Sequence, residues 1–203
     1  MVIDSNLSFA EAISGTTAPP DVLGKLSLVD VEYVSFDGRL HRGQLLLHRT
    51  LASEVKQLFC FIKEIRFPIG KVIPIVHYGW SDEASMADNN TSSFNYRFIA
   101  SSPRLSLHAF GLAIDINPRQ NPVIYEDGRV LPRGASYNPR EAGTIAQNSP
   151  LLRAFTELHW TWGGTFYPYK DYHHFEKIIF SENDLSEIPH REGKDQSGKP
   201  PLR

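Results

Sequence analysis

The sequence has one cysteine, no long apolar run and almost no excess of charge, and each shortage excludes a class of protein. Because Cys60 is the only cysteine, no internal disulfide can stabilise the fold. No stretch approaches the roughly 18 apolar residues that a membrane-spanning helix needs. The formal net charge of -2 over 203 residues gives no reason to expect nucleic acid or an anionic membrane as a partner. The neighbours of Cys60 are apolar, so we expect a small core residue rather than a nucleophile.

Both ends of the chain are polar. The first residues, "MVIDSNLSFAEAISG", lack a basic leader and a continuous apolar run, so they do not resemble a signal peptide. Residues 1–26 are polar and broken by Pro19 and Pro20, which predicts an extended lead-in. Residues 181–203 end in "GKDQSGKPPLR", which predicts a polar, disordered tail. The globular domain is then expected over residues 27–180, a length sufficient to bury a core.

Short strands recur through this domain. The segment 31–49, "VEYVSFDGRLHRGQLLLHR", alternates apolar and polar residues around an Asp-Gly pair, which is typical of a hairpin. A second Asp-Gly hairpin is predicted in "VIYEDGRVLP". "KVIPIVHYG" is interpreted as a buried strand, and "LAIDI" and "HHFEKIIF" as further strands. The polar stretch 80–102 is predicted to be a long loop, and long loops in compact domains are often functional.

Two segments predict helices. In "SEVKQLFCFIKEIRF", Ser53 is the expected N-cap, and apolar residues recur at helical spacing: Val55, Leu58, Phe59, Ile62 and Ile65. In "SPLLRAFTELHW", Ser149 is the expected N-cap, with Pro150 at the first helical position. Helices interspersed with hairpins favour the α+β class.

A histidine and an aspartate lie seven residues apart in "SLHAFGLAID". In one continuous helix His108 and Asp115 would be separated by about 10 Å along the axis, too far for a zinc ion with bonds of about 2 Å. Gly111 and the strand-like "LAIDI" instead predict a turn that brings the two side chains together. A buried carboxylate is costly unless it is paired or binds a metal. The alternative is an ordinary turn that leads into a core strand.

A second cluster of ionisable residues occurs in "KDYHHFEK". A strand that begins near His173 sends His174 and Glu176 to one face and His173 to the other, so the two histidines do not easily serve as ligands together. Asp171 precedes His174 by three residues, which places a carboxylate near whatever His174 binds. Taken alone, the segment can also be explained as an exposed strand edge.

The two segments together favour a metal site. His108, Asp115 and His174 would form a two-histidine, one-carboxylate site with an open fourth position, the pattern of a catalytic zinc centre. A further carboxylate nearby would supply a base. Four other histidines have no carboxylate at a spacing that indicates a site, and we expect them to be surface or packing residues: His41, His48, His159 and His190. His77 ends an apolar segment and is ambiguous.

Both segments resemble the signatures of a known family. "SLHAFGLAIDIN" matches the Ser-x-His-x-x-Gly-x-Ala-x-Asp signature of the zinc D-alanyl-D-alanine carboxypeptidases, the VanY-like family. That family includes the L-alanyl-D-glutamate endopeptidases of phage endolysins. "TWGGTFYPYKDYHHFE" resembles its second signature, Trp-Gly-Gly followed by Asp-x-x-His-Phe-Glu, and "ASMADNNTSSFNYR" resembles the segment that carries its active-site arginine. The resemblance covers roughly residues 30–178.

The resemblance implies a role for each matched residue. One zinc ion would have three protein ligands: His108, Asp115 and His174. Asp171 would be the general base, and Arg97 would stabilise the developing oxyanion and contact the substrate together with Ser106. The chain departs from the family where His173 replaces a frequent proline, where Thr165 and Phe166 replace Asp-Trp, and where Tyr96 replaces a frequent cysteine. These departures bear on pocket shape and specificity.

The resemblance also implies a fold and an activity. The expected fold is a single α+β domain with a central antiparallel sheet flanked by helices, as in the zinc DD-peptidase (hedgehog-like) fold. The expected activity is zinc-dependent hydrolysis of peptide bonds in peptidoglycan stem peptides, of the D-Ala-D-Ala carboxypeptidase or L-Ala-D-Glu endopeptidase type. The alternative is a non-catalytic zinc-binding module of the same fold; a serine hydrolase is disfavoured because no Gly-x-Ser-x-Gly elbow is present.

The same resemblance gives expectations about partners and location. Peptidoglycan peptide stems are the expected partner, with no nucleic acid, no membrane span and a monomeric state. The expected site of action is the periplasm or cell wall. The absence of a clear signal peptide fits release as in phages or a shortened form of an exported enzyme.

Overall fold

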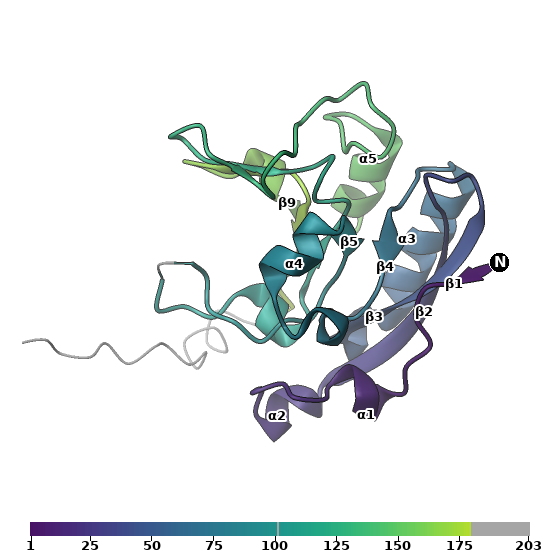
Figure 1. Cartoon of the computed structure of the whole chain (residues 1–203), viewed down its shortest axis with the longest axis vertical. Helices are drawn as coiled ribbons and strands as arrows, with labels where there is room; N and C mark the ends of the chain where they lie inside the picture. The colour runs from purple at the N-terminus through teal and green to yellow at the C-terminus, as the bar shows by residue number, and fades with distance from the viewer. Residues whose placement is uncertain (101, 180–203) are drawn as a thin grey trace, which may run out of the picture.

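The computed structural model describes residues 1–100 and 102–179, so the predicted tail over 181–203 lies outside the described residues. The described part is a mixed α and β structure with several small sheets and few helices (Figure 1). Its strands are β1 (Val2–Ile3), β2 (Leu26–Val34), β3 (Leu40–His48), β4 (Lys71–Val72), β5 (Asn90–Thr91), β6 (Ala113–Asp115), β7 (Val123–Ile124), β8 (Val130–Leu131), β9 (Thr161–Trp162), β10 (Lys170–Asp171) and β11 (His174–Glu176). Its α-helices are α1 (Phe9–Ala12), α2 (Pro20–Leu23), α3 (Ala52–Glu64), α4 (Asp82–Ala87) and α5 (Pro150–Glu157), and its 3₁₀-helices are η1 (Arg49–Leu51), η2 (Ile75–Tyr78), η3 (Leu107–Phe110) and η4 (Gly163–Thr165).

The predicted first hairpin is present as the antiparallel pair β2 and β3. The register runs from Leu26 opposite His48 to Val34 opposite Leu40. β1 adds in parallel to the free side of β3, giving the strand order β1-β3-β2. Helix α3 packs against this sheet (Figure 1). Together they bury much of the main apolar core.

Helix α3 follows the predicted apolar stripe but differs in its details. Val55, Leu58, Phe59 and Ile62 are buried against the sheet, whereas Ile65 is 37% exposed beyond the helix end. The helix begins at Ala52, directly after η1, so Ser53 is not its N-cap. Cys60 is exposed and not a core residue, because it lies outside the 3–4 spacing of the stripe.

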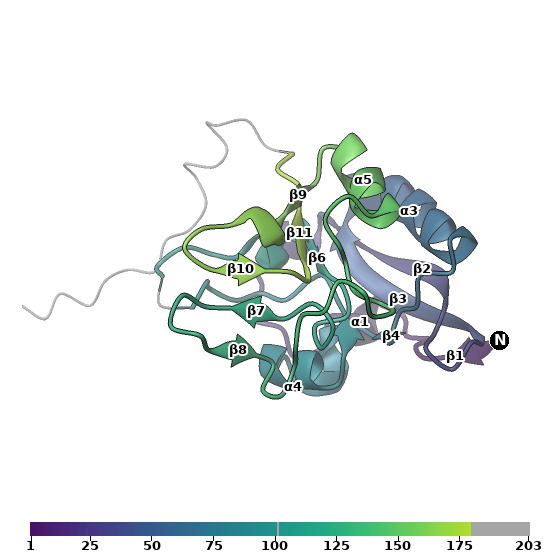
Figure 2. The ribbon, with the colours of Figure 1, turned by 90° about the horizontal axis from the view of Figure 1, so that it is seen from above.

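The expected single central antiparallel sheet is replaced by several small ones. Within residues 1–100 and 102–179 there are three three-stranded sheets and one two-stranded pair. The strands after β3 are only two or three residues long and are interrupted by turns, which prevents one continuous sheet. Two of the small sheets, β6-β11-β9 and β10-β7-β8, are antiparallel and occupy the half of the molecule away from β1 (Figure 2).

Other predicted segments have mixed outcomes. The second Asp-Gly hairpin is confirmed as β7 and β8. Helix α5 begins as expected, because Ser149 Oγ accepts a hydrogen bond from the Leu152 amide at 3.2 Å. The predicted strand over 71–79 is mostly the 3₁₀-helix η2, which follows Pro74, a residue with no N–H for a strand ladder. The predicted loop over 80–102 contains α4 and β5.

Residues 1–26 are more structured than an extended lead-in. They form β1, α1 and α2, and α1 has a capping box in which Ser8 and Glu11 bond each other's backbone amides. Apolar residues of this segment join a second core cluster with Leu46 and Phe94. The described helices include none that is long and apolar enough to cross a membrane.

Candidate metal centre

Two paired strands bring the first two candidate ligands together. β6 and β11 are antiparallel, with Asp115 directly opposite His174. Side chains alternate along a strand, and Ile114 and Phe175 point into the main core, so Asp115 and His174 share the other face. Directly opposed residues on one face have neighbouring side chains. The pairing therefore explains why residues 59 positions apart meet.

His108 reaches the same place from the 3₁₀-helix η3. Ser106 is the N-cap of this helix, and its hydroxyl accepts a hydrogen bond from the His108 amide at 3.3 Å. Gly111 ends the helix in the left-handed conformation, with φ of 66°, and leads into β6. A Cβ at Gly111 would lie 2.6 Å from the backbone nitrogen of His48. Both the positive φ and this close approach therefore require glycine. The bend predicted at Gly111 is present.

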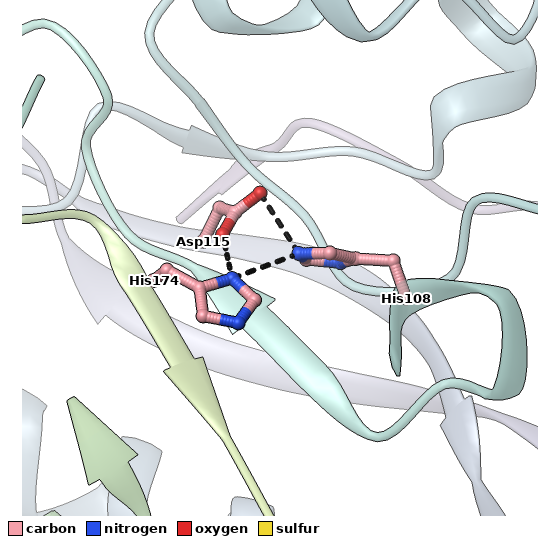
Figure 3. A group of neighbouring side chains, drawn as sticks. All are labelled: His108, Asp115 and His174. Atoms are coloured by element: carbon pink, nitrogen blue, oxygen red, sulfur yellow. Dashed lines mark hydrogen bonds and ion pairs between the residues drawn. The ribbon is translucent and has the colours of Figure 1, made fainter. Parts of the chain in front are cut away.

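The three side chains point toward one another (Figure 3). His108 Nε2 lies 3.1 Å from Asp115 Oδ2 and 3.2 Å from His174 Nδ1. His174 Nδ1 lies 3.1 Å from Asp115 Oδ1. Four ligands at 2.0–2.1 Å around a tetrahedral zinc ion are about 3.3 Å apart. The two imidazole nitrogens and the carboxylate, which turns one oxygen toward each ring, therefore lie close enough together to hold one tetrahedral metal ion.

The second nitrogen of each histidine ring is also engaged. His108 Nδ1 lies 2.5 Å from the Ser93 carbonyl oxygen, and His174 Nε2 lies 3.0 Å from Glu176 Oε2. Both acceptors require a donated N–H, which directs His108 Nε2 and His174 Nδ1 toward Asp115. Metal-binding histidines almost always have such a partner behind the ring, which fixes tautomer and orientation. The arrangement supports the same two nitrogens as ligand atoms.

The charges of Asp115 and the neighbouring histidines shift one another's pKa values. Burial alone would raise the pKa of Asp115, but the neighbouring His108 and His173 rings outweigh it and hold that pKa well below its usual range. Burial alone would lower the pKa of His174, but hydrogen bonds to Asp115 and Glu176 raise it to about 10. The positive charge of a protonated His174 therefore compensates the negative charge of Asp115. All three candidate ligands are buried.

Asp171 lies beside the centre, on β10. Its Oδ1 is 3.0 Å from His173 Nε2, an electrostatic contact without hydrogen-bond geometry. His173 Nδ1 lies 2.8 Å from the Asn121 carbonyl oxygen, so the ring is fixed with Nε2 toward Asp171. His173 Nε2 is also 3.8 Å from Asp115 Oδ1. The pKa of His173 is lowered by burial but raised more by Asp171 and Asp115, to about 9.

The Trp-Gly-Gly segment packs closely against these residues. A Cβ at Gly163 would lie 2.4 Å from the Asp171 carbonyl oxygen and 3.2 Å from the Cβ of His174. Only glycine permits η4 to approach β10 and β11 so closely. Trp162 is buried, and its indole N–H donates to the Tyr172 carbonyl oxygen at 2.9 Å. The segment thus has a packing role that places Asp171 and His174.

Arg97 is held by a residue that the sequence did not indicate. Its Nη2 lies 3.0 Å from Asp82 Oδ2, at the start of α4. The Arg97 backbone carbonyl accepts a hydrogen bond from the Ser106 amide at 3.0 Å, which ties the arginine segment to the start of η3. Ser106 is buried, and its hydroxyl caps η3. The structure thus places Ser106 as a support of His108 and Arg97 as a partner of Asp82.

Three supporting groups were missed at the sequence level. The Ser93 carbonyl is a backbone atom, for which side-chain patterns give no signal. The contact of Asp82 with Arg97 depends on α4, which was not predicted. Glu176 was detectable, because strand alternation already placed it on the face of His174. The alternation predicts its position but not its contact with His174 Nε2.

Residues 100–177 match a family model described as D-alanyl-D-alanine carboxypeptidase. The match includes the three candidate ligands, Ser106 and Asp171, whereas Arg97 precedes it. The resemblance found in the sequence is thereby confirmed over this part of the chain. No curated protein and no solved structure gives a significant match. Residues 100–177 are therefore similar to a family of peptidases.

Proposed function

We propose, on the premise that residues 100–177 are a peptidase domain, that the protein hydrolyses peptide bonds in peptidoglycan stem peptides with one bound zinc ion. The observation that carries the proposal is the meeting of His108, Asp115 and His174 inside the matched segment, where the nearest polar atoms of each pair of side chains are 3.1–3.2 Å apart. The bond cut is that of a D-Ala-D-Ala carboxypeptidase or an L-Ala-D-Glu endopeptidase. The site of action is the periplasm or cell wall, and the protein acts as a monomer.

The donor set favours a catalytic zinc ion over a structural one. Two imidazoles and one carboxylate leave a fourth position for water or substrate, whereas structural zinc sites have four protein ligands. When bound, such an ion acidifies a water molecule and polarises the carbonyl of the peptide bond. The protein contributes the fixed ring orientations that Ser93 and Glu176 impose.

Asp171 is the proposed general base. Its side chain is 18% exposed, more than those of His108 and Asp115, so a water or substrate can reach it. It is close enough to the centre to raise the pKa of His174 electrostatically. Asp171 would accept the proton of the attacking water on a carboxylate oxygen and then deliver it to the leaving amine. His173 would hold the carboxylate in place from behind.

Arg97 is the proposed oxyanion and substrate contact. A guanidinium is always charged and carries several donors, which suits a developing oxyanion or a substrate carboxylate. The ion pair with Asp82 restrains Arg97 through Nη2, and the Arg97 side chain is 32% exposed, so a ligand can reach it. Ser106 supports the same region through η3.

Mass spectrometry of peptidoglycan fragments incubated with the protein tests the proposal. We expect released D-alanine or cut stems with added zinc, loss of the products with a chelator, and recovery on return of zinc. Zinc binding without any cleaved product would instead favour a non-catalytic zinc-binding module of the same fold. Chelator-resistant cleavage would contradict metal dependence.

A further inference from the structure

A groove lies at the outer end of the small sheet that carries Asp171. Its volume is about 390 Å³, within the range of about 300–1,000 Å³ that is usual for small-ligand pockets. β10 pairs with β7 (Figure 2). The groove forms beside this pair, where Tyr169 directly precedes β10 and Tyr125 directly follows β7. Its lining residues are Tyr125, Glu126, Asp127, Arg129, Pro168 and Tyr169.

A series of aromatic rings connects this groove to the metal centre. The ring of Phe166 lies 5.9 Å from that of His174 and 6.1 Å from that of Tyr169. The ring of Tyr169 lies 5.9 Å from that of Tyr125. Phe166, Tyr169 and Tyr125 are each partly exposed, so the series forms a surface rather than part of the core.

The side of the centre on which this series begins is the less buried side. The side chains of His108 and Asp115 are 3% and 4% exposed, whereas that of His174 is 10% exposed and that of Glu176 is 25% exposed. The more accessible ligand is thus the one that Phe166 contacts. A substrate held at the centre therefore extends most directly over Phe166 and toward the groove.

The groove has the chemistry of a sugar site. A pyranose has an apolar C–H face that stacks on aromatic rings and a rim of hydroxyls that need both donors and acceptors. Tyr125 and Tyr169 supply rings and hydroxyls, Asp127 and Glu126 supply acceptors, and Arg129 supplies donors. Asp127 Oδ2 accepts a hydrogen bond from Arg129 Nε at 2.8 Å, which fixes both groups.

A cationic ligand fits the same groove less well. The Arg129 guanidinium already lies 4.4 Å from the centre of the Tyr125 ring, where a ligand cation would otherwise bind. Both signs of charge line the groove, so a neutral ligand with many hydroxyls is better matched than a strongly charged one.

We propose that this groove binds the saccharide of peptidoglycan while the attached peptide stem occupies the metal centre. The inference rests on the proposed function, because the sugar matters only if the stem is the substrate. Three ring spacings of about 6 Å span no more than about five residues of extended peptide. A disaccharide joined to a short stem is therefore long enough to occupy both places.

The test compares a disaccharide-bearing stem peptide with the same peptide after removal of the sugar. The wild-type protein should cleave the sugar-bearing substrate with the higher kcat/KM. The variant with both Tyr125→Ala and Tyr169→Ala should lose about tenfold in kcat/KM on that substrate and less than twofold on the bare peptide. Tyr125→Phe should retain most of the preference, because the ring remains. Tyr167→Ala is the matched control, since Tyr167 is 87% exposed and does not line the groove.

A binding measurement separates failure of this inference from failure of the proposed function. Binding of the peptide-free disaccharide is followed by NMR in the wild-type protein and in the double variant, with thermal unfolding to verify the fold. Binding that the double variant loses supports the groove even if neither peptide is cleaved, in which case only the proposed hydrolysis is contradicted. Cleavage of both peptides with equal efficiency, together with no disaccharide binding, would overturn the groove assignment.

Discussion

His174 Nε2 lies 3.0 Å from Glu176 Oε2, two residues along the same face of β11. Phe175 between them points into the core, which fixes the strand and hence the pair. The contact holds a proton on Nε2, and it leaves Nδ1 directed at Asp115 and His108. The candidate metal centre thus has a supporting carboxylate, Glu176, that is not one of the proposed ligands.

Glu176→Ala should weaken metal binding. Without the acceptor, the His174 ring loses its fixed tautomer, and groups of this kind are typically worth about 10–100-fold in metal affinity. Glu176→Gln should recover part of the loss through its amide oxygen. Competitive zinc titration gives the measurement, and Glu157→Ala on the exposed face of α5 is the control. Equal zinc affinity in the wild-type protein and Glu176→Ala would contradict the role assigned to Glu176.

Gly111→Ala should destabilise the fold and disturb the metal centre. The position has φ of 66°, and an added Cβ would lie 2.6 Å from the His48 amide nitrogen. Strain of this kind costs about 1–3 kcal/mol. Gly79→Ala separates the two causes, because Gly79 has φ of 58° but nothing within 4 Å of a Cβ. Urea unfolding should show a clearly larger loss for Gly111→Ala; equal losses would mean that the close contact has no consequence.

Metal affinity should rise with pH. The raised pKa of His174, about 10, means that a proton on this ring stabilises the metal-free fold. That contribution is complete below the unfolded value of about 6.5 and is lost as pH rises through about 10. A metal ion requires the deprotonated ring, so zinc binding near neutral pH should release a proton. Calorimetry in two buffers of different ionisation enthalpy measures this release, and identical heats in both buffers would contradict it.

Elements that depend on contacts between residues close in the sequence were predictable from the sequence. The β2–β3 hairpin and the Ser149 cap of α5 follow from an Asp-Gly turn and a capping hydroxyl. The grouping of His108, Asp115 and His174 was predicted because a turn at Gly111 and a strand at His174 are also local features.

Features that depend on tertiary contact were not predictable in the same way. The strands after β3 are too short to show a clear alternation, so their division into separate sheets has no sequence signal. Cys60 lies among apolar neighbours, yet helical geometry turns it outward. The Ser93 carbonyl and the ring series from Phe166 to Tyr125 involve segments far apart in the chain, and only the folded structure brings them together.

The comparison of Asp171→Asn with the wild-type protein tests the central claim most directly, because Asp171 is assigned to the chemistry and not to the metal. Zinc content and turnover of stem peptides are measured on the same samples. We expect one zinc ion per chain in both proteins and a kcat that is lower in Asp171→Asn by about 10²–10⁴-fold. Wild-type turnover by zinc-loaded Asp171→Asn would contradict the account.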